Sequence, residues 1–264
     1  MYRQHFGITD QPLGKNQREL WDDGYLVTLQ ERFNGLLKSP GLGLFTGEAG
    51  VGKTALLRQL THALNPHQYQ IIYTAETDFG RFDLYRNLAL ELNLEPTFRR
   101  AQLWRDIKVR ITELVDHKNV LPIWIIDEAQ NLPREFFRDF PAFLNFAFDS
   151  RDLMTVWLVG QPQLAHSLSL TAYTALSSRI QVRLELLPVS DRTRFNPMIE
   201  QGLKTVGCQQ TLLSDTGLEI LHQASQGKPR HAGQILKTAM QLAVPKGLNH
   251  LPDELLQQAI EILR

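Results

Sequence analysis

Cysteine, long apolar runs and an excess of either charge are nearly absent from this sequence, and each absence excludes a class of protein. Cys208 is the single cysteine among 264 residues, so the chain has no internal disulfide and no cysteine-based metal site, which agrees with a reducing compartment. No segment approaches the roughly 20 apolar residues of a membrane-spanning helix, and residues 1–11 lack the apolar centre of a signal peptide. We therefore expect a cytoplasmic protein without a membrane partner.

Charge is balanced over the whole chain but not locally. Lys plus Arg and Asp plus Glu number 28 each, so any contact with DNA has to come from a local patch. Between residues 81 and 110, seven basic residues stand against four acidic ones. The apolar spacing of 101–116 turns Arg105 and Lys108 outward, where they either follow phosphates without reading bases or belong to a solvated helix face. The candidate DNA contacts are Arg81, Arg99, Arg100, Arg105 and Lys108.

Apolar segments of strand length alternate with amphipathic segments as far as Pro188, as is typical of a parallel sheet with helices on both faces. The predicted strands are 41–46, 70–74, 120–126, 154–159 and 180–186. Beyond Pro188, helical spacing recurs over 191–206, 214–225, 230–243 and 252–263. The predicted fold is α/β, a five-stranded parallel sheet with a small all-helical lid. The predicted domains are 1–40, with an irregular arm over 1–20 and a helix starting at Asp22 and Asp23, then 41–188 and 189–264.

A glycine-rich segment joins the first predicted strand to the helix after it. Residues 47–54, Gly-Glu-Ala-Gly-Val-Gly-Lys-Thr, have the spacing and the strand–loop–helix context of a phosphate loop. Its backbone N–H groups and the helix N-terminus attract phosphates, Lys53 reaches the β- and γ-phosphates, and Thr54 holds Mg²⁺. ATP and Mg²⁺ are therefore the predicted cofactors. The predicted nucleotide-binding residues are Gly47, Glu48, Ala49, Gly50, Val51, Gly52, Lys53, Thr54, Ala55 and Asp127.

An apolar strand that ends in two acids supplies the other half of the predicted site. Asp127 and Glu128 directly follow Ile123-Trp-Ile-Ile. Asp127 would orient the Mg²⁺ shell with Thr54, and Glu128 would polarise the attacking water as general base. Strand-terminal acids also occur as ordinary helix caps, but the preceding phosphate loop favours the catalytic interpretation. The sequence thus predicts an ATPase that hydrolyses ATP to ADP and phosphate.

Further elements resemble one branch of the AAA+ ATPases. They are His5-Phe6-Gly7, Asp127-Glu128-Ala129-Gln130, Val159-Gly160-Gln161-Pro162, Ser178-Arg179-Ile180 and Gly227-Lys228-Pro229-Arg230. The branch is the ExeA/GspA-like one, which is similar to the regulators of DNA transposition of the TniB, TnsC, IstB and MuB type. The resemblance covers almost the whole chain. It implies a P-loop AAA+ nucleotide-binding domain over 41–188 and a lid domain over 189–264.

The resemblance also implies roles for three residues. Gln161 matches the sensor after the fourth strand, with a plain strand-to-turn residue as the alternative. Arg230 matches the second sensor, on the lid, with a solvated helix-start arginine as the alternative. Arg179 matches the arginine finger, which acts on a neighbouring subunit and so requires a homo-oligomer, either a ring or a helical filament. Arg183 and Arg151 are rivals for that role, and a surface salt bridge accounts equally well for each. The predicted catalytic residues are Glu128, Lys53, Gln161, Arg179 and Arg230.

Six phenylalanines follow the acidic pair. We place them on the next helix, where packing against the sheet or against a neighbouring subunit explains them better than a cofactor does. They are Phe136, Phe137, Phe140, Phe143, Phe146 and Phe148.

The resemblance implies two functions, of which we prefer the first. It is an oligomeric, ATP-dependent regulator that binds double-stranded DNA without sequence preference and recruits or activates a transposase, with or without a target-selection protein. The loop from Thr77 to Arg81 would then join the basic patch in contacting DNA. The alternative is an ATPase for assembly of a secretion apparatus, whose relatives continue into a membrane helix and a periplasmic region, whereas this sequence stops at Arg264. A third possibility is a slow signalling or scaffold ATPase.

Overall fold

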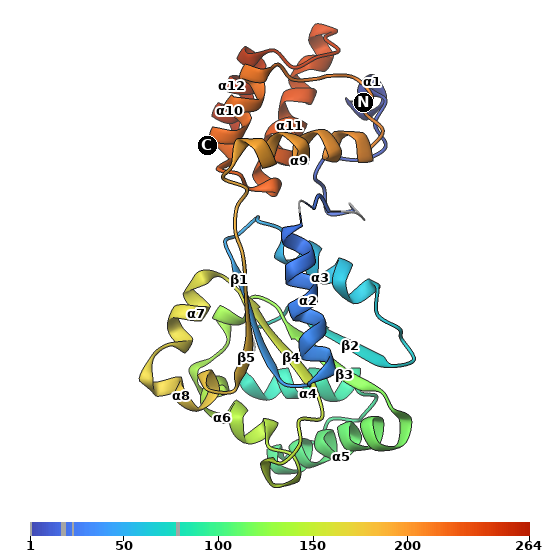
Figure 1. Ribbon diagram of the computed structural model, residues 1–264, viewed down its shortest axis with the longest axis vertical. Coiled ribbons are helices and arrows are strands. Elements are labelled where there is room, and N and C mark those ends of the chain that lie inside the picture. Colours follow the sequence, from blue (N-terminus) through green and yellow to red (C-terminus); the bar gives the residue numbers. More distant parts are fainter. Residues whose placement is uncertain (1, 17–19, 23, 78–79) are drawn as a thin grey trace. The chain divides into compact units, whose positions relative to one another are not determined.

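The computed structural model contains a five-stranded sheet and a group of helices, and it describes residues 2–16, 20–22, 24–77 and 80–264 (Figure 1). Contacts divide the chain into two compact units. The sheet unit comprises Val27–Gly47 and Leu60–Glu185, and the helical unit comprises Met1–Leu26, Glu48–Gln59 and Leu186–Arg264. The predicted boundary near residue 188, between the nucleotide-binding domain and the helical lid, stays a prediction. Asp23, Asp78 and Phe79, which belong to a predicted helix start and a predicted DNA loop, lie outside the described residues.

Five strands form the sheet in the order β2-β3-β4-β1-β5. Their bounds are β1 (Leu42–Gly47), β2 (Tyr69–Thr74), β3 (Leu121–Ile126), β4 (Thr155–Gly160) and β5 (Ile180–Leu186), each within one residue of the prediction. β2 pairs with β3, β3 with β4, and β4 with β1 in parallel, with Leu42 opposite Val156. Every residue of β1 and β4 is buried, as expected for strands covered on both faces. The predicted fold class is confirmed.

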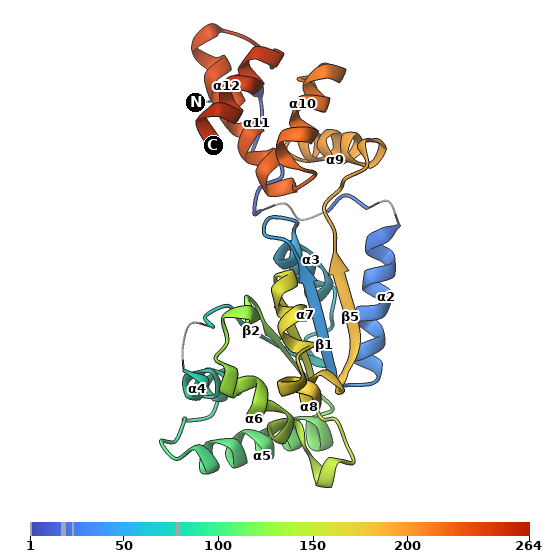
Figure 2. The ribbon, with the colours of Figure 1, turned by 90° about the vertical axis from the view of Figure 1, so that its left-hand side faces the viewer.

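Helices cover both faces of this sheet, with α2 (Tyr25–Lys38) on one side (Figure 2). Phe33 of α2 stacks on Trp157 of β4, with the ring centroids 5.2 Å apart. The other face carries α4 (Arg81–Glu91), α5 (Arg100–Lys118), α6 (Arg134–Leu144), α7 (Pro162–Leu168) and α8 (Thr174–Ser177). Because successive residues of a strand point to opposite faces, Trp157 meets α2 while Val156 and Leu158 join the cluster under α4, α5 and α6.

The helix that follows the acidic pair, α6, ends before the last two of the six phenylalanines. Its four buried phenylalanines are Phe136, Phe137, Phe140 and Phe143. α6 ends at Leu144 because Asn145 adopts an extended backbone, so the prediction that Phe146 and Phe148 lie on this helix was wrong. Phe146 is buried beyond the helix, whereas Phe148 is fully exposed in the short 3₁₀ segment η2 (Ala147–Asp149).

The helical unit contains α9 (Arg192–Thr205), α10 (Asp215–Ser225), α11 (Pro229–Ala243) and α12 (Asp253–Leu263), each within one residue of the prediction. The side chains of Asp191 and Ser214 accept hydrogen bonds from N–H groups in the first turns of α9 and α10, as good N-caps do. None of the described helices combines the length and the apolarity that crossing a membrane requires.

The irregular arm predicted over residues 1–20 was wrong at its start, because residues Tyr2–Phe6 form helix α1. Phe6 and Ile8 are buried in the apolar cluster of α9–α12, and the backbone N–H of Thr9 donates to Val206 O at 2.8 Å. A five-residue helix is too short to be stable alone. Its stability therefore comes from apolar contacts with residues about two hundred positions away, which a local pattern does not reveal.

Candidate functional site

The glycine-rich loop lies between β1 and α3 (Lys53–His62), as the motif predicts. Gly50 and Gly52 have φ angles of +85° and +108°, in the region that other residues adopt only with strain. α3 then presents the N–H groups of its first turn and the positive end of its dipole. A loop of this kind at a helix N-terminus suits the phosphates of a nucleotide.

Lys53 is buried at the start of α3, with 6% of its surface exposed. Its Nζ donates a hydrogen bond to the carbonyl oxygen of Glu48 at 3.0 Å, so the ammonium lies on the loop itself. Thr54 follows as the second residue of α3. The buried ammonium, the hydroxyl and the loop amides together form the donor set that an anionic phosphate chain requires.

The start of α11 contacts the same loop within the helical unit. The backbone N–H of Arg230 donates to Gly50 O at 3.2 Å, and a Cβ on Gly50 would lie 3.3 Å from the Arg230 Cβ. Lys228 Nζ forms an ion pair with Glu48 Oε2 at 2.6 Å. Gly227, whose φ is +68°, leaves no room for a Cβ against Val189 O. The Gly-Lys-Pro-Arg element therefore positions the start of α11 against the loop, and the predicted role of the Arg230 side chain as a second sensor stays a prediction.

The acidic pair lies in the sheet unit, directly after β3. Asp127 is buried, and its two carboxylate oxygens accept hydrogen bonds from Tyr73 Oη at 2.8 Å and from the Glu128 N–H at 2.9 Å. Glu128 has a left-handed backbone, with φ of +50°, and its carbonyl oxygen accepts a bond from Thr77 Oγ1 at 3.0 Å. Such strain in a residue other than glycine persists where the surroundings impose it, commonly at functional sites.

Gln130 connects the acidic pair to the end of β4. Its Nε2 donates to Glu128 Oε2 at 2.6 Å, and its Oε1 accepts from the backbone N–H of Gln161 at 3.1 Å. A Cβ on Gly160 would lie 2.5 Å from the Gln130 Oε1, so glycine makes room for the amide. The predicted sensor Gln161 is thus joined to Glu128 through Gln130. Gln130 is not among the predicted site residues, although its position two residues after Glu128 is visible in the motif.

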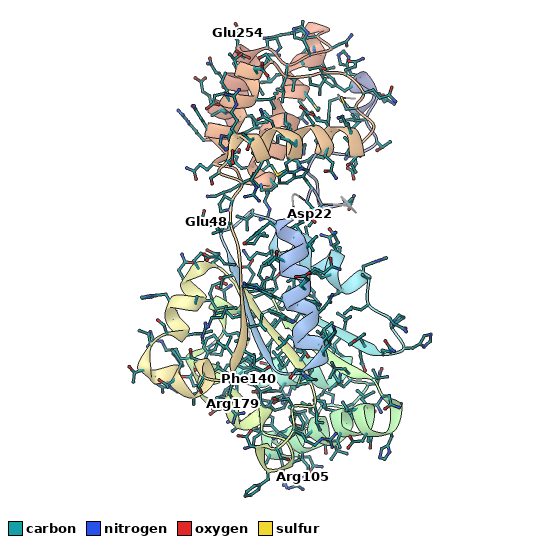
Figure 3. All side chains as sticks on the ribbon, viewed as in Figure 1. Asp22, Glu48, Arg105, Phe140, Arg179 and Glu254 are labelled. Carbon is teal, nitrogen blue, oxygen red and sulfur yellow. The ribbon has the colours of Figure 1, made fainter. Side chains whose placement is uncertain are left out.

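The three arginines that compete for the role of finger all have partners in their own chain. Arg179 donates two hydrogen bonds to the Asp149 carboxylate at 3.0 and 2.9 Å, and these bonds lower the pKa of Asp149. Arg151 binds Asp116 in the same two-pronged way, and Arg183 binds Ser177. Arg179 precedes β5 (Figure 3), so it lies at the amino ends of the parallel strands. Asp127 and Glu128 lie at the opposite, carboxyl edge of the sheet.

Intramolecular contacts occupy most of the predicted DNA patch. Arg81 and Arg100 both form ion pairs with Asp139, at 2.6 Å for Arg100. The prediction that Lys108 faces outward was wrong: its Nζ donates to the carbonyl oxygens of Ala142 and Asn145, and burial lowers its pKa. The carbonyls at the end of α6 attract this ammonium. Arg99 and Arg105 extend into solvent, with Arg105 on the outer side of α5 (Figure 3).

Comparisons with known proteins show which family the sequence resembles. Residues 36–168, about half of the chain, match the model of a family described as the AAA domain. The chain is 29% identical over 256 residues to general secretion pathway protein A of Aeromonas hydrophila, and the match covers 94% of this chain but only 46% of that protein.

Solved structures resemble the chain in fold. Cdc6p from Pyrobaculum aerophilum has a TM-score of 0.74 at 15% identity, covering 96% of this chain and 70% of the other. The ORC1 protein of Aeropyrum pernix in complex with DNA has a TM-score of 0.70 at 16% identity, covering 95% and 68% respectively. At such identities the likeness concerns the fold alone.

Proposed function

The chain belongs to the AAA domain family, and from that premise we propose that it is an oligomeric ATPase that acts in the assembly of a secretion apparatus. The phosphate loop carries the enzymatic part of the proposal, because two left-handed glycines lead to a buried Lys53 at the N-terminus of α3. The relative in the general secretion pathway supports the cellular role. Since the chain spans about half the length of that relative, the role is inferred for this chain and not transferred from the whole protein.

The loop and the acidic pair would bind different parts of magnesium-ATP. When bound, magnesium-ATP supplies an electrophilic γ-phosphoryl group whose charge the metal partly neutralises. Lys53 would bind the β- and γ-phosphates, and Thr54 and Asp127 would hold the metal ion. Asp127 already lies in a fixed orientation through Tyr73 and the Glu128 N–H. Residues 47–55 would contact the phosphates mainly through backbone N–H groups.

Glu128 would accept the proton of the attacking water. Its carboxylate is held by Gln130, which also binds the backbone of Gln161, so the base and the predicted sensor are oriented together. Arg230 would contact the nucleotide at the loop, where its backbone N–H already donates to Gly50 O. We further propose that residues 41–188 bind the nucleotide and that 189–264 form a lid, with 1–40 as an arm and a helix.

Arg179 would act on the nucleotide of a neighbouring subunit. It lies at the edge of the sheet opposite to its own Asp127 and Glu128, so it is badly placed to act on its own chain. A head-to-tail oligomer supplies the missing arginine, and its guanidinium would stabilise charge on the transferred phosphoryl group. Release from Asp149 is then part of activation.

The transposition hypothesis, which we preferred on sequence alone, now has less support than its alternative. The curated relative belongs to a secretion pathway, and Arg81, Arg100 and Lys108 are engaged within the chain. DNA binding, a transposase and a target-selection protein therefore stay hypotheses, and the experiment below distinguishes them from the secretion role.

Nucleotide binding and hydrolysis by the purified chain test the proposal. We expect Mg²⁺-dependent hydrolysis of ATP, and a loss of ATP affinity of about 100-fold in Lys53→Ala, because a charge-assisted contact to phosphate disappears. Lys38→Ala, which removes an exposed lysine at the end of α2, is the matched control and should bind normally. Equal affinities in all three proteins would refute the site.

Duplex DNA then separates the two cellular roles. Oligomers that form with ATP alone, seen by light scattering and negative-stain microscopy, support the secretion role. Oligomers that require ATP and DNA together, with binding that weakens steeply as salt rises, support the transposition role instead.

A further inference from the structure

The segment between α6 and β4 presents an exposed aromatic side chain on a strained turn, which we call the Phe148 turn (residues 146–151). Ala147, Phe148 and Asp149 are consecutive residues with φ angles of +46°, +62° and +63°. Phe148 is fully exposed, and none of the residues that the structure describes covers its phenyl ring. Three strained residues in a row persist only where neighbouring contacts impose them.

Hydrogen bonds and a backbone bridge hold the turn in this conformation. Asp149 receives two hydrogen bonds from Arg179, Arg151 makes two to Asp116, and Phe146 and Arg151 form an isolated antiparallel bridge. Ser150 Oγ donates to Ala147 O at 2.6 Å. The phenyl ring is therefore presented by a stiff support. A side chain ordered in advance loses less conformational entropy on binding.

The same unit contains a cavity of about 370 Å³ with no occupant from its own chain, which we call the α6–α7 cavity. Its size falls within the range of about 300–1,000 Å³ that is usual for ligand pockets. Its apolar lining residues are Leu132, Phe137, Leu164, Leu170, Ala172 and Tyr173, of which Leu170 and Ala172 are exposed. Arg134 and Arg138 also line it, and neither forms an ion pair within the part of the chain that the structure describes.

The Phe148 turn and the α6–α7 cavity complement each other in chemistry. The turn offers an aromatic ring followed by Asp149, whose carboxylate becomes available once Arg179 is released, and the cavity offers an apolar lining and two arginines. The turn precedes β4, at the amino edge of the sheet, whereas the cavity lies between α6 and α7, with Gln130 and Leu164 near the carboxyl edge and Leu170 beyond the end of α7. Two different surfaces of one molecule that bind each other form a head-to-tail contact, which builds rings or filaments.

We propose that the Phe148 ring of one copy inserts into the α6–α7 cavity of the next copy. This inference rests on the proposed oligomeric ATPase and names the surfaces through which it assembles. Arg179 is hydrogen-bonded to the Phe148 turn, and Gln130 lines the cavity and also donates a hydrogen bond to Glu128. The same contact therefore brings the arginine of one copy towards the catalytic base of the next copy.

Cysteine cross-linking tests the contact directly. Phe148→Cys and Ala172→Cys place thiols on the turn and on the exposed lining of the cavity, and the natural Cys208 is buried. Under mild oxidation with ATP, the double variant should give a ladder of dimers, trimers and higher species on a non-reducing gel. A mixture of the two single variants should stop at the heterodimer. Dimers alone from the double variant, or no cross-link in a solution that light scattering shows to be oligomeric, would overturn the proposal.

A second pair of variants tests the same contact without introduced thiols, through the concentration at which each variant oligomerises. Phe148→Ser removes the ring from an exposed position, so folding should be unaffected while the concentration needed for assembly rises by about tenfold or more. Phe98→Ser is the matched control, because Phe98 is also largely exposed, at 90%, but lies between α4 and α5. It should assemble normally, and an equal effect of both substitutions would contradict the proposal.

Different results would refute the proposed function and this inference. If the unaltered chain neither binds nucleotide nor oligomerises, the ATPase assignment is wrong. If it hydrolyses ATP and oligomerises while Phe148→Ser assembles like the unaltered chain, the assignment stands and the interface is wrong.

Discussion

The phosphate loop and the acidic pair are positioned by different means. The loop depends on backbone conformation, with glycines at φ angles that other residues avoid and with α11 bound to the Gly50 carbonyl. The acidic pair depends on side chains, because Tyr73 and Gln130 each hold one carboxylate. The loop therefore tolerates few changes of residue type, whereas the acidic pair should lose function in steps as its partners are removed one by one.

The largest effect is expected at the base itself. Glu128→Gln keeps the size of the side chain and removes its basicity, so hydrolysis should fall by about 10²–10⁴-fold while ATP stays bound. Single-turnover hydrolysis and equilibrium binding of ATP measure the two quantities separately. Glu135→Gln, on the exposed side of α6, is the control and should hydrolyse normally. Undiminished turnover in Glu128→Gln would remove the general base from the mechanism.

Gly50→Ala tests whether backbone conformation shapes the loop. Alanine at a φ of +85° costs about 1–2 kcal/mol, and its Cβ would press on Arg230, so ATP affinity should fall by about 20-fold. Isothermal titration with a non-hydrolysable ATP analogue measures the change. Gly35→Ala on α2 meets no atom within 4 Å and should leave affinity unchanged. Equal binding by both variants would mean that the loop is not under conformational constraint.

Gln130→Ala tests whether side chains orient the base. It removes the bond to Glu128 and leaves the Gln161 N–H without its acceptor, so kcat should fall by about tenfold with little change in KM for ATP. A merely structural role would lower both the melting temperature and the affinity. Gln163→Ala, exposed on α7, serves as the comparison. A kcat equal to that of Gln163→Ala would contradict the positioning role.

Tyr73→Phe should have the smallest effect. It removes a single hydrogen bond to the Asp127 carboxylate from a tyrosine that is about half exposed, so water replaces part of the lost bond. We expect the Mg²⁺ concentration for half-maximal hydrolysis to rise by about threefold. Tyr69→Phe, at the start of β2, is the control. If Tyr73→Phe had a larger effect than Gln130→Ala, Asp127 and not Glu128 would be the more sensitive member of the pair.

The motifs that sequence analysis placed correctly are local in the chain. The phosphate loop occupies eight consecutive residues, and the acids directly follow an apolar strand, so spacing alone indicated both. Strand and helix bounds followed from periodicity in the same way. Residues whose positions depend on distant partners were harder to place. Lys108 bonds to the end of α6, and Phe148 lies on a turn held by Arg179 and Asp116.

By itself, then, the sequence determined the α/β fold class, the phosphate loop and the position of the acidic pair, because periodicity and short-range spacing act within a few residues. Tertiary structure alone decided that Gln130 bridges Glu128 to Gln161, that α1 packs among the helices of the helical unit, and that a stiff turn displays Phe148. Each depends on contacts between residues far apart in the chain, whose energies no local pattern encodes.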